Sequence, residues 1–186
     1  MKKLLAPVAA FVLAMSVIAP SQAAAADSDS FAFLAGAGAI CGLAADACPD
    51  VARAANGDTV SITGMGSLST HPKSGSGNGT FTHKSASGTT LASGTWMVTD
   101  LLSFVDYGPG GDGFSAFHAG NALFSVNLLV NNVVVHTGIL EVTCRLPGAG
   151  GPSENGKEEG VRLNVQGGIN FNDKVSGFTV FSPTKG

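Results

Sequence analysis

Four histidines are the first candidates for chemistry, because imidazole is a common ligand for metals and a common acid–base group. They are His71, His83, His118 and His136. None has a second histidine two or four residues away, the spacing that places two ligands together on a strand or helix. The chain also has no Cys-x-x-Cys pair. We therefore predict that the protein has no metal site.

Ser115 lies in Gly113-Phe114-Ser115-Ala116-Phe117, which approaches the Gly-x-Ser-x-Gly nucleophile elbow. Phe117 replaces the second glycine of that motif, so the match fails. The remaining candidates for an isomerase or hydrolase site are polar residues on strands, and His136 and Glu141 are the two that we select as catalytic candidates. Without a local motif, we favour a non-catalytic protein.

Two glycine-rich stretches, 74–79 and 108–113, are candidates for cofactor-binding loops. The first lacks the Gly-Lys-Ser/Thr ending of a phosphate-binding loop. The second has too few oxygen ligands at fixed spacing for a calcium loop. The expectation is that the protein uses no cofactor and that both stretches are flexible connections.

The loop from Asp106 to Gly120 is the best candidate for a binding site. Aromatic residues in a glycine-rich loop can line the mouth of a β-domain and contact a ligand, or they can fold back as a plug. The predicted ligand-binding residues are Tyr107, Phe114, Phe117 and His118. Their chemistry suits a small apolar molecule or the apolar patch of an extracellular macromolecule.

The first 26 residues have the pattern of a secretory signal peptide. Lys2 and Lys3 precede an apolar run, and small residues follow it at the cleavage positions. Removing this segment leaves eight basic and 13 acidic residues, a formal charge of −5. That balance gives no basic surface for nucleic acid, and no second apolar run suggests stable membrane insertion after cleavage. We predict a secreted protein, extracellular or, in a Gram-negative bacterium, periplasmic.

All three cysteines lie after the predicted signal peptide, at Cys41, Cys48 and Cys144. In an oxidising compartment one pair is expected to form a disulfide. The short loop from Cys41 to Cys48 makes this the pair that we select, although a bond from either one to Cys144 would join the N-terminal segment to the sheet. A buried Cys144 is favoured over a catalytic thiol, because only Arg145 lies beside it to lower its pKa.

The elements that must position these residues are mostly strands. Only 12% of the residues are charged and 26 are glycine, which excludes a helical bundle. Residues 27–57 are predicted to be a linker and a short helical cap, with helical turns at 50–55, and residues 58–186 an antiparallel β-domain. Within the latter we expect a strand over 59–70 with bulges at Gly64 and Gly66, a loop over 71–79, and strands over 80–84 and 89–104, the last bulged at Gly94.

The clearest hairpin follows Gly120. Asn131 and Asn132 can form a two-residue turn, because both tolerate positive φ. If Val130 faces Val133, then Phe124 faces Ile139 and Asn127 faces His136. The predicted apolar face consists of alternate residues on both strands, namely Phe124, Val126, Leu128, Val130, Val133, Val135, Thr137 and Ile139.

The chain then has a predicted loop over 145–160 and short strands over 161–165, 169–171 and 178–181. About eight closely spaced strands indicate an all-β antiparallel meander, closed as a barrel or, as second choice, packed as a sandwich. This layout resembles small secreted barrels of the calycin or allene-oxide-cyclase type in architecture alone. The leading functional expectation is a non-catalytic binding domain, with an extracellular enzyme and a structural surface protein as alternatives.

Overall fold

The computed structural model describes residues 30–150 and 159–184 and contains a single antiparallel sheet. The predicted signal peptide and most of the predicted 145–160 loop lie outside these residues. The elements are β1 (Ser30–Ala35), η1 (Gly38–Gly42), β2 (Asp50–Ala54), β3 (Thr59–Thr70), β4 (Lys73–Lys84), β5 (Thr90–Pro109), β6 (His118–Val130), β7 (Val133–Cys144), β8 (Gly160–Val165), β9 (Asn170–Ser176) and β10 (Thr179–Thr184). The all-β prediction is confirmed, with ten strands rather than about eight.

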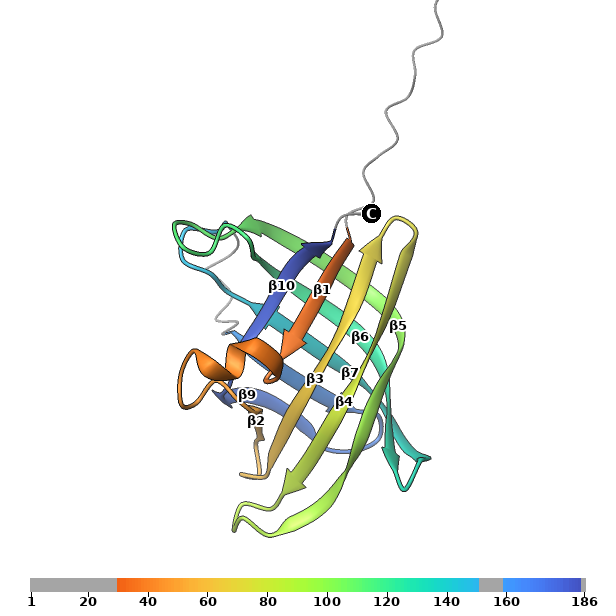
Figure 1. Cartoon of the computed structure of the whole chain (residues 1–186). Helices are drawn as coiled ribbons and strands as arrows, with labels where there is room; N and C mark the ends of the chain where they lie inside the picture. The colour runs from red at the N-terminus through yellow and green to blue at the C-terminus, as the bar shows by residue number, and fades with distance from the viewer. Residues whose placement is uncertain (1–29, 151–158, 185–186) are drawn as a thin grey trace, which may run out of the picture.

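The order of the strands is β1-β10-β6-β5-β4-β3-β2-β9-β8-β7, with further pairings β1–β3 and β6–β7. The two strands at the ends of this order, β1 and β7, therefore also pair with strands inside it. Strand β3 is long enough to pair with β2 through residues 59–62 and with β1 through residues 64–69. In Figure 1, β1, β3 and β4 cross in front of β6 and β7, and the core lies between them.

The N-terminal part of the sequence prediction is wrong. Residues 30–35 are strand β1 rather than linker, and the expected helical turns at 50–55 are strand β2. In β2, Asp50, Ala52 and Ala54 are buried and alternate with less buried residues, which is the period of a strand. Pairing with β3 and β9 outweighs the helix propensity of alanine here. The only helical segment in the described part of the chain is the short 3-10 helix η1.

The predicted loop over 71–79 is also wrong, because residues 73–84 are strand β4. Its glycines Gly75, Gly77 and Gly79 fall at alternate positions, so they occupy one face of the strand. Pairing of β3 with β4 is regular from Thr59 to Thr70 and shows no bulge at Gly64 or Gly66. The register shifts of β5 lie elsewhere than Gly94, at one point between Thr90 and Ala92 opposite β4 and at three points between Val98 and Gly108 opposite β6.

Large aromatic rings fill the interior against these glycines. A Cβ atom at Gly64 would overlap the ring of Trp96, and one at Gly66 would lie 2.6 Å from Cε1 of Phe33. On β4, a Cβ at Gly75 would lie 3.1 Å from Cε1 of Phe124. The three rings are almost completely buried. These inward positions of β3 and β4, which we call the glycine wall, therefore need glycine because a side chain would not fit there. Their backbone conformation does not require it.

The Trp96 ring is also fixed by a hydrogen bond. Its Nε1–H donates to the backbone carbonyl of Thr63 at 3.0 Å, so the buried indole N–H has a hydrogen-bond partner. Phe33 stacks on Phe124 with ring centroids 4.9 Å apart, and it also contacts Phe181 at 6.5 Å. Phe104 of β5 contacts Phe181 at 5.0 Å, so rings from β1, β5, β6 and β10 form one connected aromatic cluster within the core.

The β6–β7 hairpin confirms the predicted turn, since Asn131 and Asn132 have φ angles of 52° and 62° and Val130 faces Val133. The register beyond the turn differs, because a bulge after Leu129 leaves Val135 without a partner. Leu128 therefore faces His136, Asn127 faces Thr137 and Phe124 faces Leu140.

This bulge changes which side chains of β7 reach the core. The inward residues are Leu140, Val142 and Cys144, all buried, whereas Val133, Val135 and Ile139 are exposed. The predicted apolar face is right for Phe124, Val126 and Leu128 of β6 and wrong for β7.

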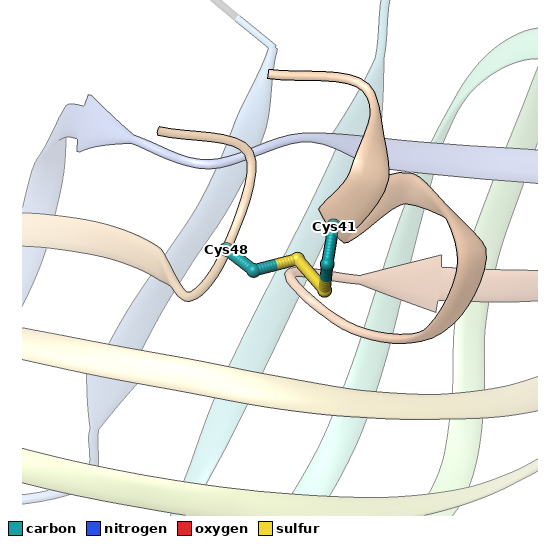
Figure 2. The surroundings of a disulfide bond; sticks show 2 residues. All are labelled: Cys41 and Cys48. Carbon is teal, nitrogen blue, oxygen red and sulfur yellow. A yellow bond between two sulfur atoms is a disulfide. The ribbon is translucent and has the colours of Figure 1, made fainter. Parts of the chain in front are cut away.

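A disulfide joins Cys41 of η1 to Cys48, and the predicted pairing is confirmed. Figure 2 shows it connecting η1 with the segment that leads into β2. Cys144 is the free cysteine and is buried in β7. In the described residues, no helix has the length and apolar character needed to cross a membrane.

The outward face of β3 and β4 carries pairs of hydroxyl groups. Oγ1 of Thr63 lies 2.7 Å from Oγ1 of Thr80, and Oγ of Ser67 lies 3.0 Å from Oγ of Ser76. Cross-strand hydroxyl pairs of this kind support strand register. In the middle of these two strands, glycines therefore face the aromatic rings of the core and hydroxyl pairs face outward.

Replacing Gly64 with alanine tests the glycine wall. The new methyl group would overlap Trp96 and lie 2.6 Å from the carbonyl oxygen of Asn78, so we expect a loss of about 2–3 kcal/mol in the free energy of unfolding, measured by urea denaturation. Gly42→Ala is the matched control, because a Cβ there meets nothing within 4 Å. Equal stability of the two variants would contradict this packing.

Candidate functional site

An apolar pocket of about 430 Å³ lies where η1, the β5–β6 connection and the start of the β7–β8 connection meet strand β10. Its volume is within the range of small-molecule sites. The lining is mostly aliphatic and aromatic, with three polar residues: Ile40, Leu43, Phe114, Phe117, Arg145, Leu146, Pro147, Glu159, Phe178, Thr179 and Val180. We call this the β10 pocket.

The β5–β6 connection contributes two phenylalanines to the β10 pocket. It is built from successive turns, in which the N–H of Phe114 donates to Gly111 and that of Phe117 donates to Phe114, both at 2.9 Å. The N–H of Gly111 donates to the carbonyl of Pro147 at 2.6 Å, so the two connections are tied together. Phe114 and Phe117 are 38% and 36% exposed, which leaves part of each ring available to a ligand.

The N-terminal segment also lines the pocket, through Ile40 and Leu43. Ile40 is buried against the sheet, whereas Leu43 is 68% exposed at the edge of the pocket. Backbone hydrogen bonds hold this segment to the start of β10: Gly36 donates to Phe178 at 2.9 Å, and Phe178 donates to Ala47 at 3.0 Å. Together with the disulfide, these bonds fix the wall in place.

Two charged side chains line the β10 pocket. Oε1 of Glu159 accepts a hydrogen bond from the N–H of Thr179 at 3.1 Å, and burial raises the pKa of Glu159 although Lys174 and Arg145 partly oppose the shift. Arg145 is exposed at the edge. The hydroxyl of Thr179 donates to the carbonyl of Thr143 at 2.6 Å, so that group is already used by the fold.

Asp50 is a fully buried carboxyl group that interacts electrostatically with Glu159. Its Oδ1 accepts the N–H of Val161 at 3.2 Å, while Oδ2 has no hydrogen-bond partner within the described part of the chain. Burial raises its pKa from 3.8 to about 7, and Glu159 adds to the rise, whereas Val161 and Lys174 lower it. The folded protein therefore favours the neutral form of this acid.

Of the four predicted ligand-binding residues, only Phe114 and Phe117 line this pocket. His118 lies elsewhere, with Nδ1 3.0 Å from the carboxylate of Asp106 and its ring 5.3 Å from that of Phe31. Tyr107 is half-buried in β5 and is not part of the lining. No pattern in the sequence predicts the part of the lining that comes from η1 and β10, since these two segments meet only through the fold.

The two catalytic candidates are not brought together. His136 is exposed near the tip of the β6–β7 hairpin, facing Leu128. Glu141 is buried, where its Oε1 accepts a hydrogen bond from Nδ2 of Asn121 at 2.7 Å and lies 3.8 Å from the guanidinium of Arg162. The prediction therefore missed Asn121, and no acid–base pair joins Glu141 to His136.

Other polar groups give weaker candidates. A hollow of about 660 Å³ beside Arg53, Asn170 and Asp173 has a mixed lining of amide, charged and small apolar side chains. Among residues 30–150 and 159–184, no group of three or more His, Cys, Asp and Glu side chains is arranged to hold a metal ion.

Comparison with known proteins found no matching family model, no similar curated protein and no similar solved structure.

The buried Asp50 predicts a pH dependence of stability. Because its folded pKa of about 7 lies above the ordinary 3.8, its stabilising contribution is complete below about pH 4 and is lost as the pH rises through 7. Each unit of difference corresponds to about 1.4 kcal/mol, so the loss is a few kcal/mol. Asp50→Asn should flatten this decline in urea denaturation between pH 4 and 8, with a residual slope from Glu159.

The control for this measurement is Asp46→Asn, at an exposed position of the same N-terminal segment. It should retain the wild-type decline. A wild-type protein whose stability is constant or rises over this range would contradict the assignment of Asp50 as a mainly neutral group.

Cys144 should be inert in the folded protein. Burial raises the pKa of its thiol to about 12, with a smaller contribution from Glu159, so almost no thiolate is present at neutral pH. Iodoacetamide at pH 8 should leave the native chain unmodified and should alkylate one cysteine per chain after denaturation without reductant, as measured by mass spectrometry. Rapid labelling of the native protein would contradict this environment.

Proposed function

We propose that the mature chain is a secreted, non-catalytic β-domain that binds a small apolar ligand in the β10 pocket. The observation that carries this proposal is an apolar pocket lined by partly exposed phenylalanine rings of the β5–β6 connection and by the exposed Leu43. Pockets of this size and composition are typical of small-molecule sites. Phe114 and Phe117, chosen from the sequence as ligand contacts, both line this pocket.

The packing of the interior supports a site at the edge of the sheet rather than inside it. Trp96, Phe33, Phe124 and Phe181 are almost completely buried and fill the core. A ligand inside the sheet would need to displace these rings. The separation of Glu141 from His136 removes the one acid–base pair that the sequence suggested for an isomerase or hydrolase.

Barrel closure is part of the proposal. The pairings β6–β7 and β1–β3, added to the order of the sheet, allow the strands to form a closed ring that has few free edges. Secretion is supported by the signal-like sequence of residues 1–26, and the Cys41–Cys48 disulfide is compatible with an extracellular or periplasmic location.

Binding of the neutral fluorescent probe N-phenyl-1-naphthylamine tests the pocket. We expect saturable binding with an increase in fluorescence, and a loss of affinity of about fivefold or more in Phe117→Ser, because an aromatic contact is removed. Leu91→Ser is the control, at an exposed apolar position of β5 outside the pocket lining. Absent binding, or equal loss in both variants, would overturn the proposal.

A further inference from the structure

The hollow of about 660 Å³ lies where the end of β2 and the turn after it meet the start of β9. It shares no lining residue with the β10 pocket, so a ligand here would be independent of one bound there. Ala54, Ala55 and Ile169 provide short apolar contacts, and the other lining residues are polar: Arg53, Asn56, Asn170, Asn172 and Asp173. Polar side chains therefore outnumber apolar ones, unlike in the β10 pocket.

Arg53 and Asp173 bring opposite charges to the hollow, at positions that face each other in the pairing of β2 with β9. Both are exposed, and within residues 30–150 and 159–184 neither side chain forms an ion pair or a hydrogen bond. The register shifts at this point, so that Asn172 is an extra residue in β9. Bulges of this kind redirect the side chains beside them. The hollow therefore holds one available cation and one available anion.

The three asparagines add neutral hydrogen-bonding groups. Oδ1 of Asn56 accepts the N–H of Asp58 at 3.1 Å, which fixes this side chain and leaves its amide hydrogens for a ligand. The backbone carbonyl of Asn172 accepts a hydrogen bond from Nε of Arg162 at 2.9 Å, so the bulge is held by its backbone. In the described part of the chain, the side-chain amides of Asn170 and Asn172 have no partner. A carboxamide both donates and accepts, so these groups are complementary to a peptide bond.

We propose that this hollow binds a short zwitterionic peptide, with its terminal carboxylate on Arg53, its terminal ammonium group on Asp173 and its peptide bond among the asparagines. The planar guanidinium matches a carboxylate, and the carboxylate of Asp173 accepts from an ammonium group. Two charges in fixed places give the ligand one direction. Exposed charge pairs contribute little each, so the dissociation constant is expected to be about 1 mM.

NMR titration of the isotope-labelled mature chain with glycylglycine at neutral pH tests this site. We expect saturable shifts of the backbone amides of residues 53–56 and 169–173. Two matched probes each lack one charge: N-acetylglycylglycine has no ammonium group, and glycylglycinamide has no carboxylate. Each should bind about three- to fivefold more weakly, because one exposed charge interaction is lost. Maltose, an uncharged polar molecule, should leave these amides unshifted.

Two variants assign the two ends of the ligand. Arg53→Met should abolish the preference for glycylglycine over glycylglycinamide and keep the preference over the acetylated peptide, whereas Asp173→Asn should do the reverse. The controls are Lys84→Met and Asp112→Asn, at exposed charged positions outside the lining, and both should bind as the wild type does. The NMR spectrum also shows whether each variant is folded. Equal binding of the three peptides, shifts at these amides with maltose, no saturable shift with glycylglycine, or equal effects of variants and controls would overturn the proposal.

Discussion

The contact of large aromatic rings with glycine backbone is the constraint on which the rest of this structure depends. Trp96 and Phe33 occupy the space that side chains at Gly64 and Gly66 would take, and Phe124 packs in the same way against Gly75. Because β3 and β4 have almost no inward side chains of their own over this region, neighbouring strands supply the bulk, with Phe33 from β1 beside β3 and Trp96 from β5 beside β4. The N-terminal strand β1 is thus as necessary as the central strands, since it carries Phe33 into the cluster.

Much of the fold can be predicted from the alternation of apolar and polar residues and from the residues that favour turns. The errors of this prediction have identifiable causes. Asn131 and Asn132 predict their turn because the local backbone requirement is met by two residues that tolerate positive φ. The register of β7 could not be predicted, because nothing in the local sequence marks the bulge that leaves Val135 unpaired. Residues 73–79 have the composition of a loop, yet glycine at every second position is the pattern that a strand needs against aromatic rings.

The candidate site was predictable on one side only. Phe114 and Phe117 could be selected because aromatic residues are unusual in a glycine-rich connection, and both line the pocket. Leu43 and Phe178 could not be selected, because they are far apart in the sequence and meet through the pairing of β1 with β10 and the disulfide beside it. The burial of Asp50 could not be predicted either. Its sequence neighbours favoured a helical turn, whereas its burial follows from the place of β2 between β3 and β9.

The hydroxyl pairs on the outside of β3 and β4 have a consequence for the hydration of this surface. Thr63, Thr80, Ser67 and Ser76 bind water through neutral groups that neither titrate in the physiological range nor attract counterions. Screening by salt acts on charges and leaves such groups unaffected. Between Lys73 and Lys84 at the two ends of β4, the hydration of these hydroxyl pairs should therefore change little with ionic strength.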